Sequence, residues 1–384
     1  MKILYDDQIF TYQHFGGISR YFCELMEQYS YDPDLDFRIA LRYTLNEPLL
    51  SRPGLNRYWT RRNDFFSDSR FFVSLQKRIH LNVLNHVFRN RTESIRQLAG
   101  QDFDVFHPTY YDPYFLKFCG DRPFVLTVYD MIIEKFPEYF PGEDAVRAGK
   151  KLLAESAQRI IAISECTKKD IVTILRIPEE KVQTIYLAGS LPQAPGSPSI
   201  PASSSLPERY FLFVGNRSGY KNFPFLIRAL APVFQTHAAL YLVCAGGGAF
   251  SGSERALLQE NNMASRVVSY PADDITLASL YRNACAFIFP SLYEGFGLPV
   301  LEAFSCGCPA VLSNTSSLPE IGGDAALYFD PYDTISLADA MERVLTDESL
   351  RKELVIRGNE QGKRFSWEKT AAMTKTVYDS LASQ

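Results

Sequence analysis

AFIFPSLYEGFGLPVLEAFSCGCPAVLS, residues 286–313, places a strand, a loop, a helix and a second strand in one short run. The strand segments AFIF and PAVLS are almost wholly apolar, which is typical of strands buried on both faces of a parallel sheet. Between them, Gly295 and Gly297 lie in a loop, and Pro299 is a favoured first-turn residue of the helix LPVLEAFSCG that follows. This stretch therefore predicts an α/β fold with parallel strands.

The same alternation of strands and helices extends outward along the whole chain. Amphipathic helices are expected at residues 19–30, 222–234 and 274–284, among others. Further apolar strands are expected at residues 2–6, 105–109, 124–130, 159–164, 182–187, 210–216 and 240–247.

These elements fall into two groups, separated by a stretch rich in proline, serine and glycine at residues 189–208. We therefore expect two doubly wound parallel-sheet (Rossmann-like) domains, residues 1–188 and 209–365, that face each other across a cleft. Residues 366–384 read as a final helix that packs back on the first domain. Such sheets bind ligands at the carboxyl ends of their strands.

Composition limits the classes of function. With 384 residues, 46% apolar side chains and a net charge of -4, the chain can bury large cores and does not look like a nucleic-acid binder. A large neutral ligand, or an anion held in a local basic pocket, stays open. The seven cysteines are odd in number and include no CxxC pair, which argues against a zinc site or a disulfide framework.

The N-terminal segment MKILYDDQIF reads as a first buried strand rather than a signal peptide, because its apolar run is short and soon acidic. No apolar run reaches the roughly 20 residues of a membrane-spanning helix. We expect a cytoplasmic protein, which is soluble or bound peripherally at the inner face of the plasma membrane.

The loop and helix at residues 294–302 combine features that suit a phosphorylated ligand. Gly295 and Gly297 allow the backbone to approach a ligand closely, and the following helix N-terminus offers free N–H groups to a diphosphate. Glu302, about one turn further, could accept hydrogen bonds from two vicinal hydroxyls such as those of a ribose. Glu294 would face the cleft. Alternatively, Glu302 interacts only with its helix dipole and Glu294 is an ordinary loop acid.

The segment EGFGLPVLE resembles the E-x7-E signature of the retaining, family-four glycosyltransferases of GT-B architecture, and the match is specific. The resemblance covers the chain apart from roughly residues 40–100 and the linker, and the order of the motifs agrees. The further matching motifs are FGGISRYFCEL (15–25), FHPTYYDPYF (106–115), TVYDMIIEKFPEYF (127–140), IIAISECTKKDI (160–171), FVGNRSGYKNFPFLIRAL (213–230) and SWEKTA (366–371).

The resemblance implies that a sugar is transferred from a nucleotide diphosphate donor to an acceptor hydroxyl with retained anomeric configuration. Arg217 and Lys221 are similar to the family's cationic pair on the donor diphosphate, where fixed cations stabilise the charge of the departing group. In relatives an arginine often follows the strand glycine directly, whereas here Asn216 does and Arg217 comes next. The alternative is that both cations are exposed residues on a loop before a helix.

The two glutamates take matching roles in this resemblance. Glu302 is similar to the acid that binds the ribose, and Glu294 to the acid that contacts the hydroxyls of the donor sugar. The residues expected to present backbone N–H groups to the sugar and the phosphate are Gly295, Phe296, Gly297 and Leu298.

In the first domain, Gly16 and Gly17 follow the first strand, where a turn without side chains would let this domain close on the diphosphate. A tight turn without a ligand is the alternative. Asp130 follows the third predicted strand and is expected to contact the sugar or the acceptor. Relatives often have histidine where this chain has Tyr129. His107, at a strand end, could face the cleft or be purely structural.

No metal or cofactor is expected. The resemblance suggests front-face attack, in which the leaving phosphate takes the acceptor proton and no separate general base is required. Asp32, Asp34 and Asp36 offer a D-x-D spacing, but they lie among turn formers far from the phosphate loop and read as a solvated turn. The two basic side chains and the helix N-terminus can stabilise the diphosphate without a divalent ion.

The sequence also bears on three other classes of protein. A catalytically silent sugar-nucleotide-binding subunit of the same fold stays open, although both glutamates and both cations are present. A nicotinamide oxidoreductase is disfavoured because AGGGAFSG, residues 245–252, lacks the G-x-G-x-x-G spacing. A phosphorylase of this architecture would need a lysine bound to pyridoxal phosphate, and no segment singles one out.

The donor and the acceptor are the least defined by the sequence. UDP-glucose is favoured as the donor, with GDP-mannose as the alternative. The expected acceptor is a glycan or a lipid-linked oligosaccharide in exopolysaccharide or lipopolysaccharide synthesis. Residues 52–91 carry nine Lys or Arg, two acids and many aromatic residues, and they read either as a solvated helical excursion or as a surface that docks on anionic lipid.

Overall fold

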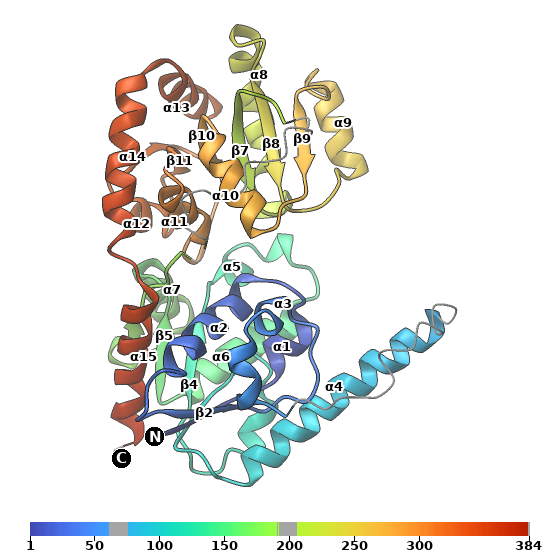
Figure 1. Cartoon of the computed structure of the whole chain (residues 1–384), viewed down its shortest axis with the longest axis vertical. Coiled ribbons are helices and arrows are strands. Elements are labelled where there is room, and N and C mark those ends of the chain that lie inside the picture. Colours follow the sequence, from blue (N-terminus) through green and yellow to red (C-terminus); the bar gives the residue numbers. More distant parts are fainter. Residues whose placement is uncertain (61–75, 190, 192–205, 383–384) are drawn as a thin grey trace.

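The computed structural model describes residues 1–60, 76–189, 191 and 206–382 and shows two parallel β-sheets, one above the other in Figure 1. The first sheet has the strand order β2-β1-β3, and a single bridge between Phe106 and Phe124 joins it to the order β4-β5-β6. All its strand pairs are parallel. Its strands are β1 (Lys2–Tyr5), β2 (Asp36–Ile39), β3 (Val105–His107), β4 (Val125–Val128), β5 (Arg159–Ala162) and β6 (Val182–Thr184).

The second sheet has the order β12-β11-β10-β7-β8-β9 and is also parallel throughout. Counted from β7, this is the doubly wound order 3-2-1-4-5-6, in which the direction of the crossovers reverses between β7 and β10. Its strands are β7 (Tyr210–Val214), β8 (Tyr241–Ala245), β9 (Val267–Tyr270), β10 (Ala286–Phe289), β11 (Ala310–Ser313) and β12 (Ala326–Phe329). The predicted fold class is confirmed.

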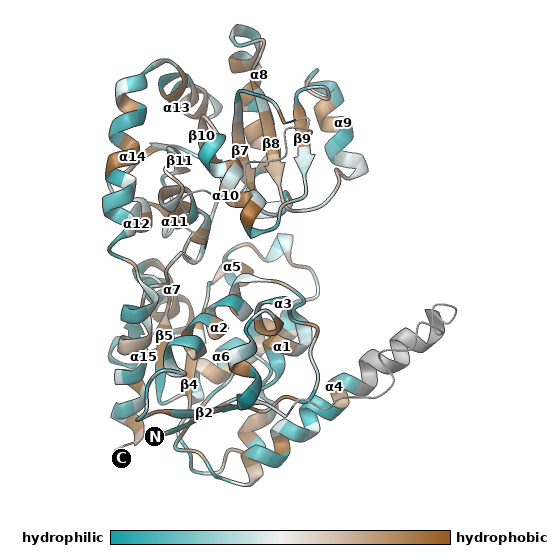
Figure 2. Cartoon of the chain, viewed as in Figure 1, coloured by the Kyte–Doolittle hydropathy of each residue, from teal (hydrophilic) through white to brown (hydrophobic). Residues whose placement is uncertain are grey.

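Helices connect the strands and cover the sheets (Figure 1). In Figure 2 the strands of the second sheet are mostly hydrophobic, whereas outer helices such as α9 and α14 carry many hydrophilic residues. The helices are α1 (Gln8–Tyr12), α2 (Gly17–Tyr29), α3 (Glu47–Leu50), α4 (Gln76–Ala99), α5 (Ile132–Lys135), α6 (Asp144–Ser156), α7 (Glu165–Leu175), α8 (Phe223–Thr236), α9 (Gly252–Glu260), α10 (Asp274–Asn283), α11 (Leu298–Ser305), α12 (Leu318–Gly322), α13 (Thr334–Thr346), α14 (Glu348–Gly362) and α15 (Trp367–Ala382).

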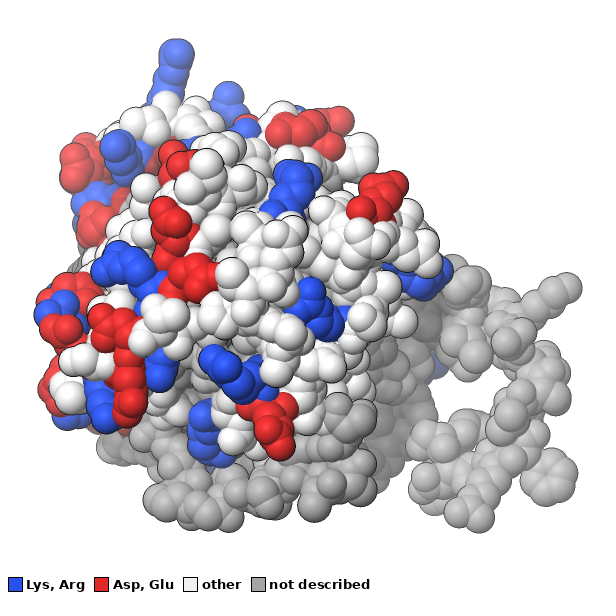
Figure 3. Space-filling view, turned by 90° about the horizontal axis from the view of Figure 1, so that it is seen from above, with Lys and Arg blue, Asp and Glu red and all other residues white. Residues whose placement is uncertain are grey.

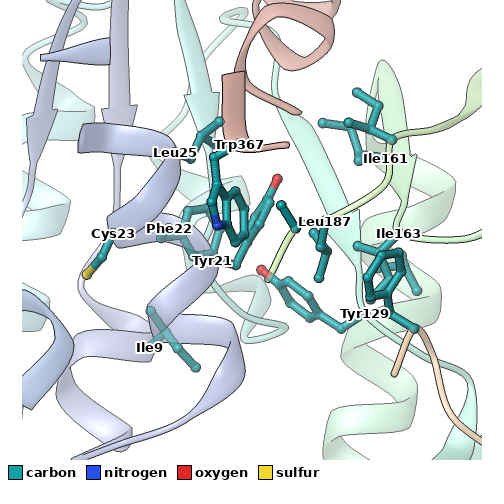
Figure 4. Close-up of a cluster of buried hydrophobic side chains, with 14 of the residues drawn as sticks. Ile9, Tyr21, Phe22, Cys23, Leu25, Tyr129, Ile161, Ile163, Leu187 and Trp367 are labelled. Carbon is teal, nitrogen blue, oxygen red and sulfur yellow. The ribbon is translucent and has the colours of Figure 1, made fainter. Parts of the chain in front are cut away.

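Helix α15 leaves the second sheet and packs against α2 and β3 of the first (Figure 1). At its start, the indole of Trp367 lies beside the ring of Tyr21, with 6.3 Å between ring centroids (Figure 4). Further along, the hydroxyl of Tyr29 donates to the carbonyl of Ala371. Of the predicted linker, residues 190 and 192–205 lie outside the described part of the chain.

Helix α4 extends away from the body of the first domain (Figure 1). It forms part of the basic and aromatic segment 52–91, of which residues 61–75 lie outside the described ones. On the end of the molecule shown in Figure 3, basic and acidic side chains are interspersed, so this view shows no continuous basic patch among the described residues. None of the described helices combines the length and the apolar character needed to cross a membrane.

Candidate functional site

The two sheets meet at the loop between β10 and α11, which is the glycine-rich loop of the sequence motif. The carbonyl of Gly295 accepts hydrogen bonds from the hydroxyls of Ser164, at 2.6 Å, and Thr167, at 3.2 Å, both in the first domain. A Cβ atom on Gly295 would lie only 1.8 Å from the carbonyl oxygen of Tyr129. Glycine is therefore required here for the two domains to approach each other this closely.

Further contacts beside this loop also cross between the domains. The hydroxyl of Tyr293 donates to the carboxylate of Asp170, at 2.6 Å. The carboxylate of Glu320 accepts hydrogen bonds from two backbone N–H groups at the start of α7, at 2.7 and 3.2 Å. These residues line part of a hollow of about 640 Å³ with walls from both domains. The structure thus shows the two domains in direct polar contact.

Lys221 and Glu294, two of the predicted site residues, form a close ion pair. The distance from Lys221 Nζ to Glu294 Oε1 is 2.6 Å, and both side chains are nearly buried. The ammonium group also lies near the rings of Tyr220 and Phe289, at 5.2 and 5.1 Å. The backbone N–H of Glu294 donates to the hydroxyl of Ser316. The pair is therefore held in place by the loops after β7, β10 and β11.

Helix α11 begins directly after Gly297 without a side-chain cap. Gly297 has a φ of 102°, which favours glycine, and a Cβ atom there would lie 2.9 Å from Leu318 Cδ2. The hydroxyl of Ser317 donates to the carbonyls of Glu294 and Phe296, each at 2.9 Å, and so fixes the loop before the helix. An uncapped, fixed helix N-terminus presents N–H groups and a positive dipole end to an anion.

Gly16 and Gly17 lie at the start of α2, opposite this helix end. A Cβ atom on Gly17 would lie 3.8 Å from Leu298 Cδ1, so the glycine turn of the first domain faces the first residue of α11. A Cβ atom on Gly16 would meet the side chain of Gln13 at 2.4 Å. The turn that sequence analysis placed near the diphosphate therefore does lie at the helix end.

Glu302 is buried inside α11, with 8% of its surface exposed. It accepts a hydrogen bond from the hydroxyl of Tyr281, at 3.3 Å, and lies 3.9 Å from a guanidinium nitrogen of Arg20. Burial raises the pKa of the Glu302 carboxyl to about 7, although the nearby Arg20 opposes this shift. The sequence did not single out Arg20 or Tyr281.

Arg217 does not lie free in the site, contrary to what sequence analysis suggested. Its guanidinium donates to the carboxylate of Glu254, at 2.8 Å, and to the backbone carbonyls of residues 246–249, and it lies over the ring of Phe250. Arg217 is buried, so the alternative of an exposed basic residue is also wrong. In this conformation it holds the glycine-rich loop after β8, and Asn216 beside it is exposed.

His107 faces the core and not the site, so the prediction that it binds substrate is wrong. Its side chain is fully buried, with Nδ1 2.6 Å from the hydroxyl of Tyr378 and Nε2 2.9 Å from that of Thr127. Burial lowers the pKa of His107 to about 3. The imidazole therefore links the first sheet to α15 in its neutral form.

This buried histidine predicts acid sensitivity. The unfolded chain binds a proton below about pH 6.5, whereas the folded chain resists protonation down to a pH of about 3. Stability should thus fall between these pH values by about 1.4 kcal/mol per pH unit from this group. When the free energy of unfolding is measured with urea, it should fall from pH 7 to pH 5 by about 2 kcal/mol more in the wild type than in His107→Gln. Equal losses in both proteins would contradict this prediction.

Asp130 lies beside Gly295 in the loop between β10 and α11, and its side chain is about one third exposed. Its carboxylate accepts a hydrogen bond from the N–H of Ile132, at 3.0 Å, and lies 3.9 Å from the buried ammonium of Lys150. Tyr129, where relatives often have histidine, is buried and donates to the carbonyl of Thr109. Of these two neighbours, only Asp130 has a side chain that a ligand could reach.

The ring of Phe296 is buried between Tyr186 and Phe365, where the chain returns to the first domain. Its side chain thus packs between the domains, and only its backbone could serve a ligand.

The three acids of the D-x-D segment lie elsewhere. Asp36 is the first residue of β2, at the amino end of the sheet, and Asp34 and Asp36 are exposed. This segment therefore lies at the amino ends of the strands, opposite the carboxyl ends where the site is expected.

Comparison with known proteins identifies the family of this chain. Residues 200–361 match the family model of glycosyl transferases group 1, and residues 58–188 match that of Glycosyltransferase Family 4. O-antigen chain mannosyltransferase B of Escherichia coli is 34% identical over 294 residues, which cover 73% of this chain and 75% of the relative. Serotype-specific mannosyltransferase WbdA of Escherichia coli is 33% identical over 229 residues, 56% of this chain and 28% of the relative.

Among solved structures, sucrose-phosphate synthase from Thermosynechococcus elongatus superposes with a TM-score of 0.74 over 99% of this chain and 98% of that chain. At 21% sequence identity, this similarity shows the fold. Both the sequence relatives and the architecture agree with the resemblance carried by the two glutamates and the glycine loop. The chain therefore belongs to the family-four glycosyltransferases of GT-B fold.

Proposed function

We propose that this glycosyltransferase moves mannose from GDP-mannose to a hydroxyl of a glycan acceptor, with retention of the anomeric configuration and without a metal ion. One observation carries the proposal: the Lys221–Glu294 ion pair lies in the loops beside the uncapped N-terminus of α11, where the two domains meet. A cation, a helix N-terminus and a carboxylate at one place suit a sugar joined to a diphosphate.

In this proposal, the diphosphate lies against the backbone N–H groups that begin α11, with Lys221 beside it. Gly16 and Gly17 leave room for the phosphates because they carry no side chains. The ribose hydroxyls donate to Glu302, one turn into the same helix. Arg217 shapes the neighbouring loop rather than touching the phosphates.

The sugar extends from the diphosphate toward Glu294 and Asp130. When the donor binds, Lys221 turns from Glu294 to the phosphate, and Glu294 accepts hydrogen bonds from sugar hydroxyls in its place. The bond between the anomeric carbon and the phosphate oxygen then breaks while the acceptor oxygen attacks from the same face. The acceptor proton passes to the departing phosphate oxygen, so no protein base takes part.

The choice of mannose rests on the relatives. UDP-glucose is the donor that sequence analysis favours, but the two relatives above are both named mannosyltransferases. The alternative of sequence analysis, GDP-mannose, fits these names better. The name of the first relative also supports an acceptor in O-antigen-type surface polysaccharide synthesis. That the protein works at the cytoplasmic face of the membrane, in contact through residues 52–91, is a part of the proposal that rests on the sequence alone.

The donor can be tested with the purified protein and a panel of nucleotide sugars. GDP-mannose should raise the melting temperature more than UDP-glucose, UDP-galactose or GDP-glucose, because a ligand that binds only the folded state stabilises it. It should also be consumed slowly by hydrolysis, and the product formed with an acceptor should keep the α configuration. Greater stabilisation by UDP-glucose would overturn the choice of donor, and binding without any turnover would favour a silent binding subunit.

A further inference from the structure

Arg20 connects the two domains at the acid expected to bind the ribose. It lies in the first turn of α2, three residues after Gly17 of the glycine turn of the first domain. Its guanidinium donates to both carboxylate oxygens of Asp274, at 2.8 and 3.0 Å, in the first turn of α10. The same guanidinium lies 3.9 Å from Glu302 and 5.2 Å from the ring centroid of Phe15.

The contact between Arg20 and Glu302 is nearly buried, whereas the side chain of Asp274 is 41% exposed, and the charges come from opposite domains. The side chains of Arg20 and Glu302 are each 11% exposed. Both acids belong to the second domain, whereas the cation belongs to the first. A carboxylate buried without a cation is unfavourable, because burial removes its hydration. Glu302 is therefore best placed to act as a carboxylate when α2 and α11 are close together.

We propose that Arg20 is a positioning residue that couples domain closure to recognition of the donor's ribose, by orienting Glu302 while it holds α2 against α10 through Asp274. This inference rests on the proposed function, since it assumes that Glu302 accepts hydrogen bonds from the ribose. When the domains separate, Glu302 loses its cation and its preference for the ribose declines. Donor binding and closure then favour each other.

The test compares GDP with 2′-deoxy-GDP by titration calorimetry. The wild type should bind GDP about tenfold more tightly, because Glu302 accepts from the 2′-hydroxyl that the deoxy ligand lacks. Arg20→Ala should weaken GDP binding about tenfold and bind both ligands equally. Glu302→Ala, which removes the acceptor itself, serves as the positive control and should show the same loss of discrimination. Arg20→Lys, which keeps the charge but loses the planar guanidinium that reaches both acids, should lie in between.

Asp274→Asn supplies a second arm. If Asp274 acts only through its ion pair with Arg20, the double variant Arg20→Ala, Asp274→Asn should bind GDP no more weakly than Arg20→Ala alone. Arg38→Ala is the matched control, since Arg38 lies on β2 with a largely exposed side chain and should leave affinity unchanged. Melting temperatures of all variants check that they fold.

Unchanged discrimination between the two ligands in Arg20→Ala would overturn this inference while leaving the proposed function intact. The same titrations with UDP and 2′-deoxy-UDP keep the result readable if the base of the donor was wrongly assigned. Failure of the wild type to bind any of the four nucleotides would instead overturn the proposed function and this inference together.

Discussion

Replacing Lys221 by methionine is expected to lower kcat for sugar transfer by about 10²- to 10³-fold, the typical loss when one fixed charge-stabilising group is removed. Methionine keeps much of the length and the apolar contacts of the lysine stem but cannot neutralise the departing diphosphate. The measurement is the rate of product formation at saturating donor, so that a change in KM is separated from a change in kcat.

The ion pair with Glu294 requires a control, because removing the lysine leaves a nearly buried carboxylate without its cation. The double variant Lys221→Met, Glu294→Gln removes both charges and should fold normally while staying inactive. Lys221→Arg keeps the charge and should retain more activity than methionine. If Lys221→Met transfers sugar within about threefold of the wild-type rate, Lys221 does not stabilise the leaving group.

Replacing Gly295 by alanine should lower kcat about 100-fold or more, since a displacement of about 1 Å in a catalytic contact can have that effect. The added methyl group would lie 1.8 Å from the carbonyl oxygen of Tyr129, which no rearrangement of side chains can relieve. The domains would have to stay further apart, and Glu294 would move away from Asp130. Steady-state rates together with small-angle scattering would detect both consequences.

Gly252→Ala is the matched control for this variant. Gly252 is the first residue of α9, and a Cβ atom there would have no neighbour within 4 Å. It should leave both the rate and the scattering curve unchanged. A fully active Gly295→Ala protein would show that the close contact seen here is not the conformation in which the sugar is transferred.

The strands predicted from sequence are those with uninterrupted apolar runs. All strands with buried neighbours on both sides, such as β7, β8 and β10, were predicted. The three that were missed are β2, β9 and β12, and each lies at an edge of its sheet. Two of them are partly exposed, so their apolar pattern is weakened: β2 alternates between buried and exposed residues, and β9 has one buried residue of four. This reason does not apply to β12, whose four residues ALYF are all apolar and mostly buried.

The site was predictable where its residues are close in sequence. Glu294, Gly295, Gly297 and Glu302 share one loop and helix, so their spacing was visible directly. Arg20 was missed because its partners Asp274 and Glu302 are more than 250 residues away along the chain. His107 was misplaced because the sequence does not reveal that α15 covers it. Arg217 was misplaced because the sequence does not reveal that the loop after β8 folds around its guanidinium.

The position of the β-phosphorus in a crystal structure of the protein with GDP tests the central claim most directly. We predict that it lies at the N-terminus of α11, with a phosphate oxygen within hydrogen-bond distance of both Lys221 Nζ and a backbone N–H of residues 297–298. A diphosphate bound elsewhere, with the Lys221–Glu294 pair still intact, would contradict the account.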